Sequence, residues 1–376
     1  MDFSLNEETV LLKNSVERFL REKCPASLVK ELIEDEEGFS KAIWKEMAEL
    51  GWFGLIYDQK YGGSEGSFFD LLILFEEIGK VLLPSPFFCS AVLSGLAINE
   101  AGDAGLKEEY LPGIVRGEKI LTLALLDEQG RYDGHDPDIE AEKTQDDAYL
   151  INGVRLLVPY AHVSDEIILC ANVKDSGSGG PTLFIVDAKA EGQEIVSLDT
   201  LAQEKLFAVI YKNVKVPAEN TVGAVGRGHT YLEKVLPKAV VLKCGEMLGG
   251  LRRAMEMTVA YVKEREQFGR PLGTLQVVQH YCADMATYLE TTRLITYEAA
   301  YLLSEGLPCD KEIAMAKAWC SNAYQKTTQI AQQLHGGIGF TEEHDLHLYY
   351  KHAKASELDF GGSMFHRSKV ADEMGI

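Results

Sequence analysis

The order of periodic patterns along the chain restricts its fold more than any other feature. Apolar residues recur at helical spacing up to about residue 117, and short β-prone segments alternate with turn signals from about residue 119 to 216. Helical patterns then return at about 229–264, 274–305, 309–338 and 343–372. Three of these four patterns run to about 30 residues, whereas the mean protein helix has about 11–12. This order predicts a helical part, a small β barrel or sandwich, and an antiparallel helix bundle.

Turn signals in the β-prone region predict where its strands end. Asn152-Gly153 lies between two short apolar segments, and this dipeptide favours a β-hairpin. The glycine-rich stretch 175–181 predicts a flexible loop between two further strands. Together these signals predict six or more short strands over about 100 residues.

Composition and charge exclude several classes of protein. The 376 residues carry a formal net charge of −21, from 37 basic and 58 acidic side chains, which argues against a nucleic-acid partner. No apolar run approaches the roughly 18 residues that a membrane helix needs. The seven cysteines include no C-x-x-C pair, which argues against a zinc ribbon and against a disulfide framework. We therefore expect a cytoplasmic protein that is not inserted in a membrane.

Two motifs in the last third of the chain carry a resemblance to a known family. The first is EREQFGRPLG at 264–273, followed by Gln276, and the second is QLHGGIGF at 333–340. These motifs look like two signatures of the acyl-CoA dehydrogenase family, and the resemblance extends to the order and size of the three segments. It implies an α+β, mainly α, fold: an N-terminal helical domain over 1–117, a middle β-barrel domain over 118–226, and a C-terminal four-helix bundle over 227–376.

The resemblance also implies a chemistry. Family members are flavoproteins that remove the α-proton and a β-hydride from an acyl-CoA thioester, with a glutamate as the base and FAD as the hydride acceptor. They act in fatty acid and lipid catabolism, and an electron-transfer flavoprotein is the implied electron acceptor. They assemble so that the far end of FAD reaches a neighbouring subunit. An acyl-CoA substrate, FAD and such protein partners are therefore expected for this chain.

Residues of the two motifs are candidates for the adenine and diphosphate end of FAD. Arg265 can offer a planar guanidinium to a phosphate. Gly336 and Gly337 allow the backbone to approach a ligand closely, and Phe268 offers a flat apolar face. Either motif alone would suit a tight turn between bundle helices better than a cofactor site, but the two together, in the family's order, favour the cofactor.

The family pattern adds three further candidates. Gln276 and Gln333 would hydrogen-bond the diphosphate–adenosine portion of the cofactor. Ser363 keeps a hydroxyl where the family has a threonine, so it joins the expected cofactor contacts.

The usual catalytic base is missing from both places where the family carries it. One place is a Tyr-Glu-Gly-Thr motif, and the matching stretch here is Phe360–Ser363, with Gly361 instead of the glutamate. The other place lies 26 residues before the motif arginine, at Ala239. Neither residue can accept a proton, so the sequence assigns no catalytic residue.

The middle domain departs from the family as well. Leu126–Arg131 replaces the family's loop Thr-Glu-Pro-Gly-Ala-Gly-Ser-Asp on the flavin's face. Leu157–Pro159 replaces the Trp-Ile-Thr segment that covers the flavin ring, and Pro159 has no backbone donor. Phe365 replaces a polar contact to the cofactor. The sequence therefore does not predict a complete flavin-ring site within this chain.

This combination resembles the small subunits of heteromeric bacterial acyl-CoA dehydrogenases, which lack the catalytic glutamate. In those enzymes the partner subunit carries the base. The resemblance implies a homologous catalytic partner, in a heterodimer or an α2β2 heterotetramer, and activity only with that partner. Two alternatives stay open: a stand-alone flavoenzyme of the same fold with monooxygenase or lyase chemistry, and a cofactor-free interaction subunit.

Other ionisable groups are candidates to replace the missing base or to bind a metal ion. Four carboxylates come into question, and each is more simply read as solvated or structural: Glu76, Glu77, Glu246 and Asp359. His344 and His347 have helical spacing, but neither an H-E-x-x-H motif nor a cysteine pair accompanies them. No metal site is therefore expected.

Overall fold

The computed structural model describes residues 5–132, 137–174 and 180–376. Most of the loop expected at 175–181 lies outside the described residues. The chain divides into two compact units. The bundle unit comprises Met1–Lys30, Ser67–Leu83 and Val240–Ile376, and the sheet unit comprises Glu31–Gly66 and Pro84–Ala239. Two helices, α2 and α7, run from one unit into the other along the chain.

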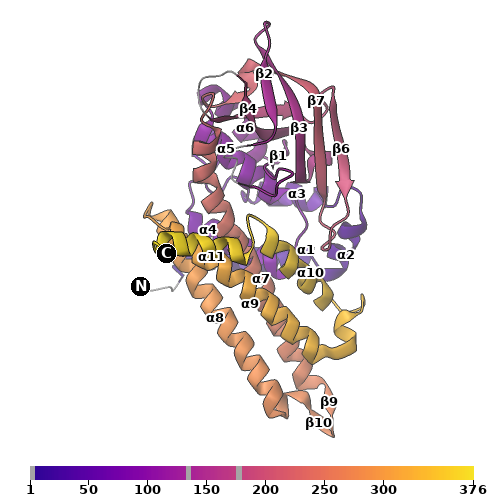
Figure 1. Ribbon diagram of the computed structural model, residues 1–376. Coiled ribbons are helices and arrows are strands. Elements are labelled where there is room, and N and C mark those ends of the chain that lie inside the picture. The colour runs from indigo at the N-terminus through magenta and orange to yellow at the C-terminus, as the bar shows by residue number, and fades with distance from the viewer. Residues whose placement is uncertain (1–4, 133–136, 175–179) are drawn as a thin grey trace. The chain divides into compact units, whose positions relative to one another are not determined.

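Long helices joined by short turns build the bundle unit (Figure 1). The helices α7, α8 and α9 appear close to the ranges that apolar periodicity predicts, and α8 lies beside α9. A shared core of Ala254, Met285, Ala331, Leu346 and Tyr349 joins α7, α8, α9 and α10. The elements of this unit, with the two shared helices, are α1 (Glu7–Lys23), α2 (Ala26–Glu34), α4 (Phe68–Val81), α7 (Gly228–Glu264), β9 (Glu266–Gln267), β10 (Arg270–Pro271), α8 (Gln276–Ser304), α9 (Asp310–His335), the 3₁₀-helix η6 (Gly336–Phe340), α10 (Leu346–Leu358) and α11 (Ser363–Glu373).

The single helix expected at 343–372 is wrong, because the structure has two helices there. A turn at Asp359–Gly362 separates α10 from α11. Phe360 and Gly361 have φ angles of 55° and 96°, which an α-helix cannot contain. Nε2–H of His366 donates to the Phe360 carbonyl at 3.0 Å and ties the start of α11 back to the turn. Apolar residues continue through this stretch, so periodicity alone does not reveal the break.

Two glycines let α4 and α7 cross very closely. A β-carbon on Gly79 of α4 would overlap the backbone carbonyl of Glu246 on α7. A β-carbon on Gly249 of α7 would overlap the backbone carbonyl of Glu76 on α4. The two backbones therefore touch where any other residue would hold them apart.

The sheet unit contains one eight-stranded sheet. Its strands follow the order β6-β7-β3-β2-β4-β5-β8, and β1 pairs with β4. The strand β4 is parallel to β1 and β2, and the other described neighbours are antiparallel. Buried apolar residues of the strands, among them Ile151, Ile167, Phe184 and Val209, form its core. The elements are α3 (Lys41–Glu49), η2 (Phe88–Ser94), α5 (Gly95–Ala101), α6 (Ala104–Val115), β1 (Leu121–Ala124), β2 (Glu140–Lys143), β3 (Ala148–Pro159), β4 (Glu166–Val173), β5 (Pro181–Asp187), β6 (Gln193–Leu198), β7 (Leu206–Pro217) and β8 (Thr221–Val222).

The hairpin expected at Asn152-Gly153 is wrong. The strand β3 runs without interruption from Ala148 to Pro159, and its pairing with β7 shifts register between Ile151 and Gly153. The Asn152 side chain accepts a hydrogen bond from the backbone N–H of Asn213 at 2.8 Å, which fastens the irregularity to β7. The dipeptide therefore forms a bulge in a continuous strand rather than a turn between two strands.

Within the described ranges, none of the helices combines the length and the hydropathy that a membrane span requires.

Candidate functional site

A pocket lies where α9 ends and η6 begins. Its volume is about 380 Å³. Gly336 ends α9 with φ 64° and ψ −142°, a conformation that residues with a β-carbon avoid. Glycine at this position therefore turns the chain sharply and lets the pocket form beside the helix end. The residues that line it are Gln329, Gln332, Gln333, Gly336, Gly337, Phe340 and Tyr350.

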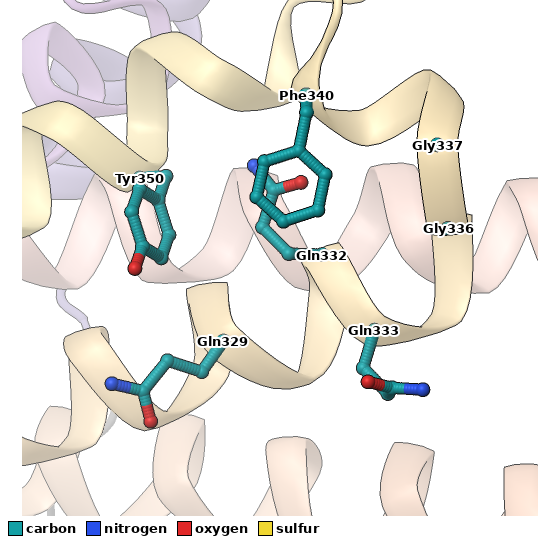
Figure 2. Close-up of a pocket in the computed structure, with 7 residues that line it drawn as sticks. All are labelled: Gln329, Gln332, Gln333, Gly336, Gly337, Phe340 and Tyr350. Carbon is teal, nitrogen blue, oxygen red and sulfur yellow. The ribbon is translucent and has the colours of Figure 1, made fainter.

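Amide and aromatic groups face each other across this pocket. Figure 2 shows Gln329 and Gln333 on α9, with the rings of Phe340 and Tyr350 on the opposite side. A β-carbon at Gly336 or Gly337 would meet no atom within 4 Å, so the backbone of the turn borders open space. The arrangement offers amide donors and acceptors, bare backbone and flat apolar faces to a ligand.

His335 directly precedes the Gly336 turn, and Tyr261 contacts both its ring and its backbone carbonyl. The ring of His335 stacks on Tyr261 of α7 at a centroid distance of 4.3 Å. The tyrosine hydroxyl donates to the His335 carbonyl at 3.4 Å. Burial lowers the pKa of His335, so its ring is neutral at pH 7. Tyr261 stands four residues before Arg265, so the same end of α7 supports the turn and leads into the first motif.

The first motif forms a small hairpin with an exposed aromatic residue at its tip. The strands β9 and β10 pair around Phe268 and Gly269, whose φ angles are 55° and 73°. This pair of positive φ angles is typical of a type I′ turn, in which a bulky first residue is unfavourable. Phe268 is 86% exposed. A strained turn that presents a large apolar side chain to solvent points to a binding role for that side chain.

Arg265 stands at the base of this hairpin. Its carbonyl accepts from the backbone N–H of Leu272 at 2.8 Å, which closes the hairpin. Among the residues that the structure describes, none pairs with the Arg265 guanidinium, and the side chain is exposed. The cation is therefore available to an external anion.

The seven expected cofactor residues fall into three groups. Gln333, Gly336 and Gly337 share the pocket. Arg265 and Phe268 belong to the hairpin, and Gln276 is exposed at the first position of α8, shortly after that hairpin. Ser363 differs from the others, because it is buried and its hydroxyl donates to the Ala318 carbonyl at 3.3 Å. It does not line the pocket.

Sequence reasoning missed four residues of the pocket. Gln329 stands four positions before Gln333 on α9 and therefore on the same helix face, a spacing that the sequence does show. Gln332 also lies on α9, next to Gln333, and Phe340 is the last residue of the second motif, whereas no motif marks Tyr350, which α10 brings to the pocket.

The turn at Gly361 has a backbone conformation that favours glycine. The φ of 96° at Gly361 lies in the region that residues other than glycine rarely adopt. A β-carbon there would overlap the Phe365 ring. The position is therefore shaped for glycine, and the ring of Phe365 lies where a longer side chain would begin.

The adjacent pair Glu76 and Glu77 is tied into a buried ionic cluster. Glu76 is 1% exposed, accepts from the Tyr297 hydroxyl at 2.8 Å and pairs with Arg252 at 2.5 Å. Glu77 pairs with Lys13 at 3.5 Å. Burial raises the pKa of Glu77, and the neighbouring cations oppose that effect. Both side chains hold α1, α4, α7 and α8 together, which supports their structural interpretation.

Glu246 and Asp359 also form ion pairs within the chain. Glu246 accepts from His352 at 3.0 Å and pairs with Lys243 at 2.9 Å. Burial acts to raise the pKa of Glu246, but Lys243 and His352 outweigh it and lower the pKa to about 2. A carboxylate with so low a pKa is a poor base at neutral pH. Lys243 also pairs with Asp359 at 3.3 Å.

The two segments that depart from the family in the sheet unit use their polar groups internally. The Asp127 carboxylate accepts from the backbone N–H groups of Gln129 and Arg131 and from the Arg131 side chain, at 2.6–3.0 Å. The Pro159 carbonyl accepts from the Thr122 hydroxyl at 2.7 Å, and Pro159 has no N–H to donate. These groups are therefore not free to bind a ligand.

The His344 ring takes part in a hydrogen bond within the chain. Nδ1 of His344 accepts from the backbone N–H of Leu346 at 3.2 Å. Across the described part of the chain, no group of three or more His, Cys, Asp or Glu side chains could hold a metal ion.

Comparisons with known proteins agree with this architecture. Residues 6–118 match the family model of the acyl-CoA dehydrogenase N-terminal domain, and residues 226–375 match that of the acyl-CoA dehydrogenase C-terminal domain. The short/branched chain specific acyl-CoA dehydrogenase of Bos taurus mitochondria is 31% identical over 98% of this chain and 86% of its own.

Two solved structures are similar over nearly their whole length. A variant of the steroid acyl-CoA dehydrogenase Tcur3481-Tcur3483 has a TM-score of 0.88 and 28% identity over 99% of both chains. The ChsE4-ChsE5 complex from Mycobacterium tuberculosis has a TM-score of 0.90 and 26% identity, over 100% of this chain and 99% of that chain. The family is FAD-dependent. Both family models and the bovine relative show that the chain belongs to the acyl-CoA dehydrogenase family.

Proposed function

We propose that this chain is the base-lacking subunit of a heteromeric, FAD-dependent acyl-CoA dehydrogenase, in which a homologous partner chain supplies the catalytic glutamate. The geometry of Gly361 carries this proposal. Its φ of 96° disfavours a residue with a β-carbon, and the Phe365 ring lies where the β-carbon of a glutamate would be. Glu76, Glu77 and Glu246 are occupied by cations and do not replace the base.

The pocket and the hairpin fit the adenosine diphosphate end of FAD. The Arg265 guanidinium, with which no described residue pairs, suits a diphosphate, and the bare backbone at Gly336 and Gly337 allows close approach. We assign this end of the cofactor to Arg265, Phe268, Gln276, Gln333, Gly336 and Gly337. Ser363 stays a prediction from the resemblance, since its hydroxyl donates to the Ala318 carbonyl but keeps its acceptor lone pairs. When bound, FAD accepts the hydride that leaves the β-carbon of the acyl-CoA.

The flavin-ring end supports a division of labour between two chains. The Asp127 carboxylate is bonded within its own turn, and Pro159 offers no N–H. This chain would then bind the adenosine end and complete the interface, while the partner orients the reacting carbon and takes the α-proton. One similar structure is itself described as a complex of two differently named components, which agrees with such an assembly. We further propose an acyl-CoA substrate and an electron-transfer flavoprotein acceptor for the assembled pair.

Native mass spectrometry with flavin absorbance tests the proposal. The chain is produced alone and together with a homologous acyl-CoA dehydrogenase chain encoded beside it. We expect a mixed assembly with one flavin per two chains, and α,β-dehydrogenation of an acyl-CoA only by that assembly.

Other stoichiometries would contradict the proposal in distinguishable ways. A homo-oligomer with one flavin per chain would favour a stand-alone flavoenzyme with monooxygenase or lyase chemistry. A colourless mixed assembly would favour a cofactor-free interaction subunit.

A further inference from the structure

A lysine is buried completely in the bundle unit, next to the turn that lacks the base. Lys317 of α9 is 0% exposed. Its Nζ donates to the backbone carbonyls of Ser356 at 3.1 Å, Glu357 at 2.9 Å and Gly361 at 3.1 Å. An ammonium has three N–H donors, and here each donor has one carbonyl acceptor. A weaker contact of 3.4 Å reaches the Ser321 hydroxyl.

The carbonyls of Ser356 and Glu357 need a donor because of their place in α10. Ser356 and Glu357 lie in the last turn of α10, where backbone carbonyls have no partner within the helix. The carbonyl end of a helix also carries partial negative charge, which a cation stabilises. Lys317 therefore caps α10 with a side chain that comes from another helix.

The third carbonyl belongs to the turn itself. Gly361 has φ 96°, and the residue before it, Phe360, has φ 55°. Nε2–H of His366 donates to the Phe360 carbonyl at 3.0 Å. Lys317 and His366 thus donate to two successive carbonyls of the turn, those of Gly361 and Phe360. Both of these residues have a left-handed backbone conformation.

We propose that Lys317 is a positioning residue whose ammonium acts as an internal cation. It holds the carbonyls of Ser356, Glu357 and Gly361 in one cage and so fixes the turn in a conformation that favours glycine at residue 361. The cage of three carbonyls and one hydroxyl is the kind of oxygen environment that a small monovalent cation, such as ammonium or potassium, would also accept. Any role of Lys317 in catalysis rests on the proposed function, whereas its role in holding the turn does not.

Removal of the side chain and replacement of its charge test this role. In Lys317→Ala the cage stays empty and its carbonyls lose their donors, whereas Lys317→Met fills most of the volume without a charge. Lys326→Ala is the matched control, because Lys326 is exposed on the same helix. Hydrogen exchange of residues 359–363 is measured by mass spectrometry in ammonium chloride and in sodium chloride at equal ionic strength.

We expect both Lys317 variants to exchange at least about tenfold faster than the wild type at these residues in sodium chloride. Ammonium should slow exchange in Lys317→Ala, but not in Lys317→Met, whose side chain blocks the cage, and not in Lys326→Ala. If Lys317→Ala folds poorly, the same comparison is made on its refolding yield in the two salts.

Two results would overturn the proposal. One is exchange at residues 359–363 that equals that of Lys326→Ala, and the other is the absence of any specific recovery in ammonium. The test needs neither flavin nor partner, so its failure would leave the proposed heteromeric enzyme intact. A wrong flavin stoichiometry would likewise leave the role of Lys317 intact.

Discussion

At Gly361 the backbone conformation, rather than contact with a ligand, accounts for the residue type. Substitution by alanine would place a β-carbon in a left-handed conformation, which costs about 1–2 kcal/mol, and would push against the Phe365 ring. We expect Gly361→Ala to lower the free energy of unfolding by at least that amount, measured in urea. We also expect Gly361→Glu to give no dehydrogenase activity in the isolated chain supplied with flavin and acyl-CoA.

The neighbouring glycine provides the control. Gly362 has φ −75° and ψ 175°, and a β-carbon there would come no closer than 3.3 Å to the Glu357 carboxylate. Gly362→Ala should therefore change stability much less than Gly361→Ala. Equal effects at the two positions would contradict the argument from φ, and activity in Gly361→Glu would contradict the shaping of the turn.

His366 makes the same turn sensitive to acid. Burial lowers the pKa of His366 from 6.5 to about 4, with Lys317 and Lys369 acting in the same direction. The unfolded chain binds a proton at higher pH than the folded chain does, so this stabilisation is complete above pH 6.5. It is lost as the pH falls toward 4, by up to about 3 kcal/mol. The residue can bond to the Phe360 carbonyl through Nε2–H while neutral, and its Nδ1 has no partner among the described residues.

Unfolding free energies measured between pH 7 and pH 4 check this prediction. We expect His366→Gln to keep a donor for the Phe360 carbonyl and to show a shallower loss of stability over that range than the wild type. Glu246, with a pKa of about 2, acts in a lower window, where stability is lost as the pH falls from 4.5 toward 2. Parallel curves for the variant and the wild type above pH 4.5 would contradict the role of His366.

At the scale of elements, the crossing of α4 and α7 depends on bare backbone. Gly249→Ala would force a β-carbon against the Glu76 carbonyl, and backbone cannot move aside as a side chain can. We expect this change to lower the free energy of unfolding by about 1–3 kcal/mol or more, because the helices must separate. Gly105→Ala is the control, since Gly105 lies in α6 and its β-carbon would come no closer than 3.4 Å to Asp103.

Urea unfolding of both variants distinguishes crowding from helix propensity. Alanine favours a helix over glycine by up to about 1 kcal/mol, so Gly105→Ala should be neutral or slightly stabilising. Similar stabilisation in Gly249→Ala would show that the two helices do not meet as closely as the structure places them.

Local patterns predicted most elements but not where they are interrupted. The apolar spacing of α7, α8 and α9 depends only on residues of each helix, so it could be read from the sequence. The bulge at Asn152-Gly153 is determined by Asn213 on a strand about 60 residues away. The break at Phe360–Gly361 includes a local turn signal, Gly361-Gly362, and Lys317 of α9 and His366 of α11 donate to its carbonyls. A long-range contact can thus override a local turn signal, as at Asn152.

At the scale of the whole chain, the resemblance predicted the fold class and part of the candidate pocket. Gln333, Gly336 and Gly337 lie together because they share one helix end, which a linear motif can encode. Phe340 ends the same motif and reaches the pocket through η6, whereas Tyr350 of α10 lies outside any motif. Ser363 resembles the family's threonine in residue type, yet its hydroxyl donates to Ala318 within the bundle. A matching residue type therefore does not establish the direction of its side chain.

The last prediction concerns Arg265 and the binding of FAD by the mixed assembly. If its guanidinium binds the diphosphate of FAD, Arg265→Ala removes a charge-assisted contact worth about 1.5–3 kcal/mol, or about tenfold to a hundredfold in affinity. We expect the mixed assembly to form with the same subunit ratio and the same melting temperature without flavin, but to release FAD at correspondingly higher dilution. Flavin absorbance per assembly and fluorescence of the released cofactor measure this.

Arg270→Ala is the matched control, because Arg270 is exposed on the same hairpin and no cofactor contact is assigned to it. Retained flavin in Arg270→Ala and lost flavin in Arg265→Ala would locate the diphosphate at the base of the hairpin. Unchanged flavin occupancy in Arg265→Ala would remove this residue from the cofactor site. Loss of subunit pairing in Arg265→Ala would mean that the exposed guanidinium serves the protein interface instead, since a diphosphate contact alone does not hold two chains together.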